Sequence, residues 1–199
     1  MNKLVEIKKL NEDHIKEVTH LHDNSFKGFF LTSLGKSFLE VFYKGILGHE
    51  HGFGLGAFHG EELVGFAIGT NNNTGFYRAI LKKNSLKMLL ASFPNLIVNP
   101  SSVKRIILSL LSFKNTEYSD IPVLLSICVS GNKEAKGIGK KLLGAFENEI
   151  KVAGNSQLIL TTDAKDNDYV NQFYGRNGYI LVQSFLQHKR EMNLYHKNV

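Results

Sequence analysis

Residues 129–141 read VSGNKEAKGIGKK and decide how the rest of the chain is interpreted. An apolar stretch, 121–129, runs into a polar turn, and Gly137 and Gly139 then open a segment with helical spacing. The first backbone N–H groups of a helix have no intrahelical partner and lie at the positive end of its dipole, and glycine lets an anion approach them. The stretch therefore predicts a phosphate or diphosphate site at the start of this helix.

Two other nucleotide-binding motifs do not fit this spacing. A Walker loop counted from Gly131 needs glycine where Lys136 stands, and no serine or threonine follows Lys140. A dinucleotide fingerprint needs a third glycine where Leu142 stands. An ordinary helix start with solvated lysines remains open as an alternative interpretation.

The composition is that of a folded globular protein. The 199 residues are 43% hydrophobic and 21% charged, which suits one well-buried core. One cysteine, Cys128, excludes a disulfide framework and a multi-cysteine zinc site and fits a reducing compartment. Residues 1–13 lack the apolar core of a signal peptide, and no apolar run approaches the roughly 18 residues of a membrane span. We therefore expect a cytoplasmic protein with a single domain over residues 1–199.

The net charge of +6 is concentrated in residues 73–118. This segment holds seven basic residues and one acid, whereas the rest of the chain holds 17 of each. It predicts a basic two-helix insertion, with helices at 76–93 and 103–113 separated by Asn99-Pro100. A solvated surface pair, a phosphate-recognising wall and an interfacial membrane helix remain open. Nucleic acid is not expected, because the bases are not interleaved with exposed aromatic residues.

The remaining apolar patterns alternate between strand and helix. They predict strands at 3–10, 53–58, 63–70, 121–129, 158–162, 178–185 and 190–195 and helices at 12–23, 34–47, 137–151 and 167–176. The order is β-α-α-β-β, the helical insertion, then β-α-β-α-β-β. It predicts a mixed α/β fold with one central sheet, antiparallel at first and parallel around 121–162. Because 121–129 is continuously apolar, we expect that strand to be buried on both faces.

Two stretches resemble signatures of the GNAT superfamily of N-acetyltransferases. Residues 136–143, KGIGKKLL, are similar to its coenzyme A loop, Arg/Gln-x-x-Gly-x-Gly/Ala, and 167–179, NDYVNQFYGRNGY, to its Asn-x-x-Ala-x-x-Phe-Tyr-x-x-x-Gly-Phe signature. The chain departs from the pattern at Glu134, which replaces Arg or Gln, and at Val170, which replaces alanine. Nearby lysines are expected to supply the lost positive charge. The resemblance implies a GNAT-like mixed sheet and acetyl-CoA, or coenzyme A, as co-substrate.

The resemblance also implies a role for each matching residue. It implies that the backbone of Ile127, Cys128 and Val129 pairs with pantetheine amides. It implies that the Asn167 side chain bonds the cofactor chain. The pyrophosphate is implied to be held by the N–H groups of Lys136, Gly137, Ile138, Gly139 and Lys140. Tyr174 is the implied general acid, which protonates the departing thiolate. The implied reaction is direct attack by an amine, with the oxyanion met by the Val129 N–H.

Other reactive side chains lie outside these two signatures. Cys128 lies in an apolar strand and is read as a buried hydrophobic residue, not as a nucleophile. His20 and His22 are two residues apart on a predicted helix, so we expect them on the surface and predict no metal site. A neutral amine needs a general base, for which Glu40 and Asp163 are candidates.

The acceptor side is expected to be built by residues 24–33 and by the basic insertion. Residues 30–35, FLTSLG, with Phe42-Tyr43 downstream resemble superfamily members associated with bacterial polysaccharide gene clusters. This resemblance implies a small-molecule primary amine, with an amino sugar as one candidate. A coenzyme-binding protein without catalysis and a membrane-peripheral interaction protein remain rival functions, and monomer and homodimer both remain open.

Overall fold

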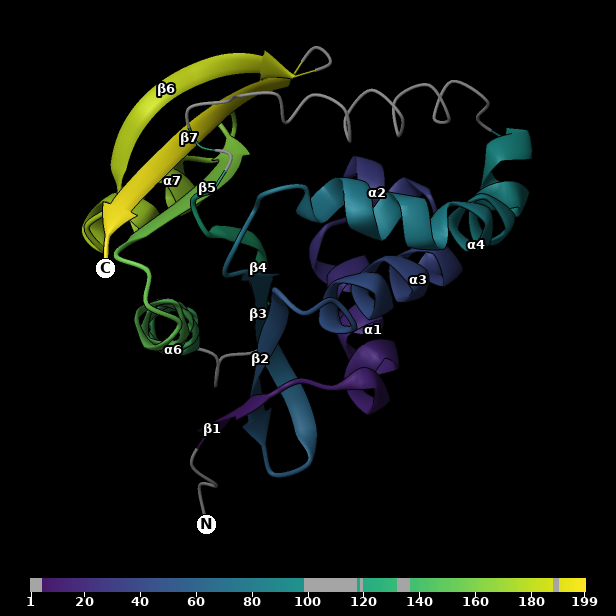
Figure 1. The fold of residues 1–199 in the computed structure, drawn as a ribbon, viewed down its shortest axis with the longest axis horizontal. Coiled ribbons are helices and arrows are strands. Elements are labelled where there is room, and N and C mark those ends of the chain that lie inside the picture. Colours follow the sequence, from purple (N-terminus) through teal and green to yellow (C-terminus); the bar gives the residue numbers. More distant parts are fainter. Residues whose placement is uncertain (1–4, 99–117, 119, 132–136, 188–189) are drawn as a thin grey trace.

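A computed structural model describes residues 5–98, 118, 120–131, 137–187 and 190–199, without the side chains of 93–98. Seven strands form one sheet in the order β1-β2-β3-β4-β5-β7-β6 (Figure 1). The strands are β1 (Val5–Lys9), β2 (Gly52–His59), β3 (Glu62–Thr70), β4 (Val123–Val129), β5 (Gln157–Asp163), β6 (Ile180–Gln187) and β7 (Arg190–Asn198). Among the described strands only β4 and β5 pair in parallel, so the predicted mixed α/β sheet is confirmed.

The helices follow the predicted order with two short additions. They are α1 (Ile15–Ser25), α2 (Phe30–Ser33), α3 (Lys36–Leu47), α4 (Phe76–Val98), α6 (Ile138–Val152) and α7 (Asp168–Arg176), and a 3-10 turn, η1 (Glu12–His14), precedes α1. The additions are η1 and the single turn α2, which lies within residues 24–33, where no helix was predicted. In α2 the Ser33 hydroxyl bonds the Phe30 carbonyl, and the Thr32 hydroxyl bonds the Phe26 carbonyl at 2.7 Å.

Helices α1, α3 and α4 cover one face of strands β1–β4 (Figure 1). The apolar spacing of α3 places Phe38, Phe42 and Ile46 on one side of the helix, and all three are buried. Helix α4 packs against α3 and contributes Phe76 and Ile80 to the same core. This core fixes α1 and α3 behind strand β4.

Helix α6 lies on the opposite face of the sheet (Figure 1). Its buried residues recur at helical spacing and are Ile138, Leu142, Leu143, Phe146 and Ile150. The helix is bounded by two glycines in the left-handed region, Gly137 at φ +86° before it and Gly154 at φ +83° after it. Both positions agree with the predicted start and end of the helix.

Strand β6 forms one edge of the sheet. It contains no charged residue, and Ile180, Leu181, Val182 and Leu186 are all exposed. At the other edge, β1 pairs only with β2.

Part of the basic insertion differs from its prediction or lies outside the described residues. Helix α4 continues to Val98, five residues beyond its predicted end. The second predicted helix, 103–113, falls outside the described residues, so a single domain over 1–199 with a two-helix insertion remains a prediction. Among the described residues, no helix has the length and hydropathy needed to cross a membrane.

Candidate acetyl-coenzyme A site

The central feature of the candidate site is the separation of β4 from β5. The two strands pair only at Val123 with Ile159 and at Leu124 with Leu160, although both continue toward their carboxyl ends. Beyond that point β4 stays paired with β3, and β5 stays paired with β7. In the described structure, the main chain of residues 125–129 therefore has no strand partner on the side that faces β5.

A β-bulge explains why the strands part at this residue. On β3, Ile68 is opposite Ser126 and the next residue, Gly69, is opposite Leu124, so Leu125 has no partner. An extra residue bends its strand and increases the local twist, which turns the rest of β4 away from β5. Gly69 also allows close approach, because a Cβ there would lie 2.1 Å from the Val123 carbonyl oxygen.

The three residues predicted to pair with pantetheine all lie in this separated segment of β4. Ile127 and Val129 pack against the α6 core, and Cys128 packs against the α1 and α3 core. All three are half-buried, as are Leu125 and Ser126, so the expectation of a strand buried on both faces is wrong here. The bulge and the loss of the β5 neighbour explain the difference.

Burial makes Cys128 a poor nucleophile. Desolvation raises the pKa of its thiol to about 12, opposed in part by a hydrogen bond with Ser25. The thiolate, which is the nucleophilic form, is therefore scarce near neutral pH. This agrees with the interpretation of Cys128 as an apolar packing residue.

The start of α6 follows the separated strand. Gly137 is the N-terminal cap residue, and the first intrahelical bond that reaches it runs from the Lys141 N–H to its carbonyl at 3.1 Å. The N–H groups of Ile138, Gly139 and Lys140 occupy the first turn, where a helix supplies no partner. The Ile138 side chain is buried, so only its backbone is placed for such a site. Lys136 and Glu134 lie outside the described residues.

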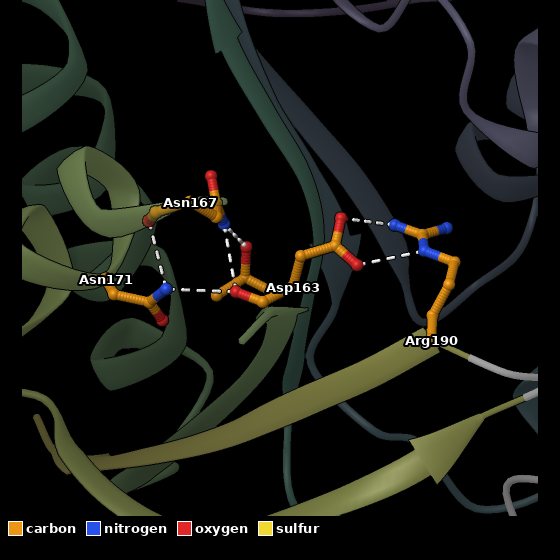
Figure 2. Close-up of polar contacts among 5 residues, drawn as sticks. Asp163, Asn167, Asn171 and Arg190 are labelled. Carbon is orange, nitrogen blue, oxygen red and sulfur yellow. Dashed lines mark hydrogen bonds and ion pairs between the residues drawn. The ribbon is translucent and has the colours of Figure 1, made fainter. Parts of the chain in front are cut away.

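Asn167 stands between the end of β5 and α7 (Figure 2). Its side-chain nitrogen donates to the Thr162 hydroxyl at 2.8 Å and to the Asp163 carbonyl oxygen at 3.1 Å. Its side-chain oxygen accepts no hydrogen bond from a described residue. Asn167 therefore fits a cofactor chain that offers an amide N–H.

Asn171 connects three elements, and Figure 2 shows its bonds to Asp163 and Asn167. The residue was not singled out from the sequence. Its nitrogen donates to the carbonyl oxygens of Asp163 and Asn167, at 3.0 and 2.9 Å. Its oxygen accepts from Asn193 and Tyr195 of β7, at 3.0 Å each. These four bonds satisfy the amide and fix α7 against β5 and β7. The asparagine lies inside the recognised signature, but the pattern alone does not indicate this role.

Tyr174 lies on the face of α7 that joins the α6 core. It is 5% exposed, and its ring contacts those of Phe173, Tyr179 and Tyr195. Ile127 and Val129 belong to the same apolar cluster. Burial raises the pKa of the Tyr174 hydroxyl, so this group keeps its proton at neutral pH.

A row of hydrogen-bonded, buried polar side chains lies behind β4. Its members are far apart in the sequence, so no local sequence pattern predicted it. Nδ1 of His22 is 2.6 Å from the Tyr43 hydroxyl, which is 3.3 Å from the Ser126 hydroxyl. His22 is 4% exposed, so the expected surface position is wrong, while His20 is exposed as predicted. His22 is buried because α3 packs over this face of α1, and desolvation lowers its pKa to about 4.

Asp163, one of the two base candidates, is held by Arg190 (Figure 2). The guanidinium donates to both carboxylate oxygens, with Nε to Oδ1 at 2.9 Å. Arg190 also stacks over the ring of Phe29, 5.0 Å from its centroid. This pair ties the end of β5 and the start of β7 to the loop before α2. Glu40, the other candidate, is half-buried on α3.

Metal ligands do not gather in the described structure. The described residues contain no group of three or more histidine, cysteine, aspartate or glutamate side chains placed to hold a metal ion.

Solved structures share this fold over nearly their whole length. An acetyltransferase of the GNAT family from Bacillus cereus aligns with a TM-score of 0.60 at 13% identity, covering 98% of this chain and 97% of that chain. The chain has the GNAT fold.

Two further structures with the GNAT fold extend the comparison. The PaiA N-acetyltransferase from Thermoplasma acidophilum, in complex with coenzyme A, aligns with a TM-score of 0.59 at 16% identity, covering 98% of this chain and 99% of that chain. An aminoglycoside 6′-acetyltransferase type Ii aligns with a TM-score of 0.63 at 15% identity, covering 97% and 96%. No family profile and no curated protein matches the sequence.

Proposed function

We propose that the chain is an acetyl-CoA-dependent N-acetyltransferase that transfers acetyl directly to the primary amine of a small molecule. The observation that carries the proposal is the separation of β4 from β5 after Leu124, followed by a helix that begins at Gly137. An extended chain with amides can take the place of the missing strand, and a diphosphate can meet the first N–H groups of α6. Coenzyme A joins these two parts in one molecule.

The residues assigned to the cofactor are those that the family resemblance implies. The backbone of Ile127, Cys128 and Val129 pairs with pantetheine, and the N–H groups of Lys136, Gly137, Ile138, Gly139 and Lys140 hold the pyrophosphate. Asn167 accepts a hydrogen bond from the cofactor chain through its side-chain oxygen, because both hydrogens of its amide are already used.

The chemistry uses groups on both sides of β4. The nitrogen of the amine forms a bond to the thioester carbonyl carbon, and the carbon–sulfur bond breaks. Tyr174 donates its proton to the departing sulfur, and the Val129 N–H donates to the oxyanion. The proton of the amine leaves through a base on the acceptor side, which the loop before α2 borders.

The proposed acceptor class is an amine carried by a sugar or a similar small polar molecule. The resemblance of residues 30–35 to members from polysaccharide gene clusters supports it. So does the overall likeness to an aminoglycoside acetyltransferase, because an aminoglycoside is an amino sugar. A panel of amino sugars, amino acids and polyamines, scored by thiol release from acetyl-CoA, tests the class.

Cofactor binding is tested first, by thermal unfolding with acetyl-CoA and with desulfo-coenzyme A. At about one hundred times its Kd, either ligand is expected to stabilise the fold by roughly 2.7 kcal/mol. Gly137→Ala should reduce the shift. If neither ligand raises the Tm at millimolar concentration, the proposal is wrong.

Catalysis is separated from binding by substitution of Tyr174. Tyr174→Phe is expected to lower the turnover on the order of 10²-fold, with desulfo-coenzyme A binding retained. Tyr169→Phe is the matched control, since Tyr169 lies on the same helix and is 84% exposed. Binding without thiol release from any member of the panel would favour the rival function, a coenzyme-binding protein without catalysis.

A further inference from the structure

The outer face of α4 carries an apolar patch that the proposed acetyl transfer does not use. Leu86, Leu89 and Leu90 are 68%, 51% and 63% exposed. Residues three and four apart are neighbours on a helix, so the three leucines form one patch. The inner face of the same helix is anchored, because Phe76, Ile80 and Met88 are buried in the core shared with α3.

Basic side chains surround this patch. Arg78, Lys82, Lys83 and Lys87 are all exposed, and none forms an ion pair with a residue that the structure describes. No acidic residue occurs between Glu62 and Glu117, so nothing nearby in the sequence offsets this charge. Long basic side chains can lay their stems along apolar surface while their charged ends reach anionic groups.

We propose that the outer face of α4 docks this protein onto an anionic membrane surface. The leucines enter the boundary between headgroups and acyl chains, and the basic residues contact the headgroups. Figure 1 shows α4 on the α3 side of the molecule, away from strands β5–β7. An amine acceptor carried at the membrane would then be within reach of the protein.

The charge pattern favours a membrane over other occupants. A second copy using the same face would bring four cations against four cations, which disfavours association. A nucleic acid would attract the lysines, but three exposed leucines offer nothing to its phosphates or bases. An anionic lipid surface satisfies both components of the face at once.

Co-sedimentation with vesicles tests the proposal without any acetyl acceptor. The full chain is expected to bind vesicles of phosphatidylcholine mixed with phosphatidylglycerol, to bind phosphatidylcholine alone weakly, and to be released by salt. Leu86→Ser with Leu89→Ser should lower the bound fraction at least about fivefold. Lys82→Glu with Lys83→Glu should lower it on the order of tenfold or more.

Matched controls exclude a general effect of exposed residues. Val152→Ser with Leu186→Ser removes two apolar side chains that are 76% and 77% exposed elsewhere. Lys16→Glu with Lys151→Glu reverses two exposed charges away from α4. These controls should bind vesicles like the unmodified chain, and circular dichroism verifies that each variant folds.

Three outcomes would overturn the proposal: no binding to anionic vesicles, equal binding to neutral and anionic vesicles, or equal losses in the control variants. Self-association that the leucine substitutions abolish, without lipid binding, would instead assign the patch to a contact between copies. A failure here leaves coenzyme binding unaffected, so the two proposals stand or fall separately.

Discussion

His22 and Tyr43 form a buried hydrogen bond of 2.6 Å behind the strand that borders the candidate site. Tyr43 is fully buried, and its hydroxyl also reaches Ser126 on β4. The chain therefore links α1, α3 and β4 through polar atoms in an otherwise apolar core. A buried group that loses its partner is destabilised by its full desolvation.

Tyr43→Phe is expected to lower the free energy of unfolding by about 1–3 kcal/mol, because Nδ1 of His22 loses its partner in the core. Urea unfolding followed by circular dichroism measures the loss. Tyr169→Phe, at an exposed position, should change it by less than about 0.5 kcal/mol. Equal stability of the two variants would show that the hydrogen bond contributes nothing.

The lowered pKa of His22 predicts a pH dependence of stability. Between pH 6.5 and about 4 the unfolded chain binds a proton at this position that the folded chain excludes. Stability should therefore fall as the pH drops through this window, by up to about 3 kcal/mol from His22 alone. Asp23, which pairs with Lys36 at 3.3 Å, opposes the shift, and Tyr43 is the partner on α3.

Urea midpoints from pH 7 to pH 4 test this dependence. The chain with His22→Gln should lose less stability over the same range, because glutamine does not titrate. An identical pH profile for the two proteins would refute the assignment to His22.

At the scale of single residues, burial was predicted unevenly. Cys128 was interpreted as an apolar packing residue, and it packs against the α1 and α3 core. His22 was misplaced, because its burial depends on α3, which is distant in the chain, and a two-residue spacing from His20 carries no information about that contact. Asn171 was missed because three of its four partners lie on β5 and β7, which no local pattern connects to α7.

At the scale of elements, the start of α6 depends on one backbone conformation. Gly137 has φ +86°, and a Cβ at that position would contact nothing within 4 Å, so only the torsion angle restricts it. Gly144 lies in the interior of the same helix and also has open space around it. The two glycines form a matched pair for substitution.

Gly137→Ala is expected to destabilise the chain by about 1–2 kcal/mol, because a side chain disfavours the left-handed region. Gly144→Ala is expected to stabilise it by about 0.5–1 kcal/mol, because alanine favours a helix interior. Thermal unfolding measures both variants. Changes of the same sign would contradict this account of the helix start.

Element boundaries were predicted well wherever a turn residue marks them. Gly137 and Asn167 each lie one residue before an observed helix, and Gly154 lies two residues after the end of α6. The loop before α3 was predicted less well, because α2 is held by side-chain bonds from Thr32 and Ser33 that leave no periodic pattern. The bulge at Leu125 was not predicted, since a continuous apolar run does not reveal where pairing stops.

At the scale of the whole molecule, the two halves of the sheet meet at the short β4–β5 contact. Helix α6 also connects them, because it packs on β2, β3 and β4 while its Glu147 reaches β7. Lys197 of β7 donates to both carboxylate oxygens at 2.8 Å, and Tyr179 donates at 3.0 Å. The Glu147 side chain is 14% exposed, so this pair is largely shielded from water.

Lys197→Met is expected to lower the free energy of unfolding by on the order of 2 kcal/mol, because it leaves the Glu147 carboxylate shielded without its cation. Lys8→Met, which breaks the exposed pair with Glu6, should cost at most about 1 kcal/mol. Chemical denaturation compares them. A larger loss for Lys8→Met would show that the Glu147 pair does not join the halves.

The mixed strand directions followed from the order of elements and from the family signatures, whereas the order of the strands within the sheet was not predicted. The exposure of the α4 leucines was not predicted, because both faces of that helix are apolar in sequence. Only packing against α3 distinguishes the buried face from the outer one.

An open sheet ordinarily has two free margins, one at each outermost strand. Because β4 and β5 share only two paired positions, this sheet has a third margin in its interior. Slender molecules that present evenly spaced amides fit such a margin. Short peptide mimics of a strand are therefore rational starting compounds for a ligand of this margin, and they would not need to resemble a nucleotide at all.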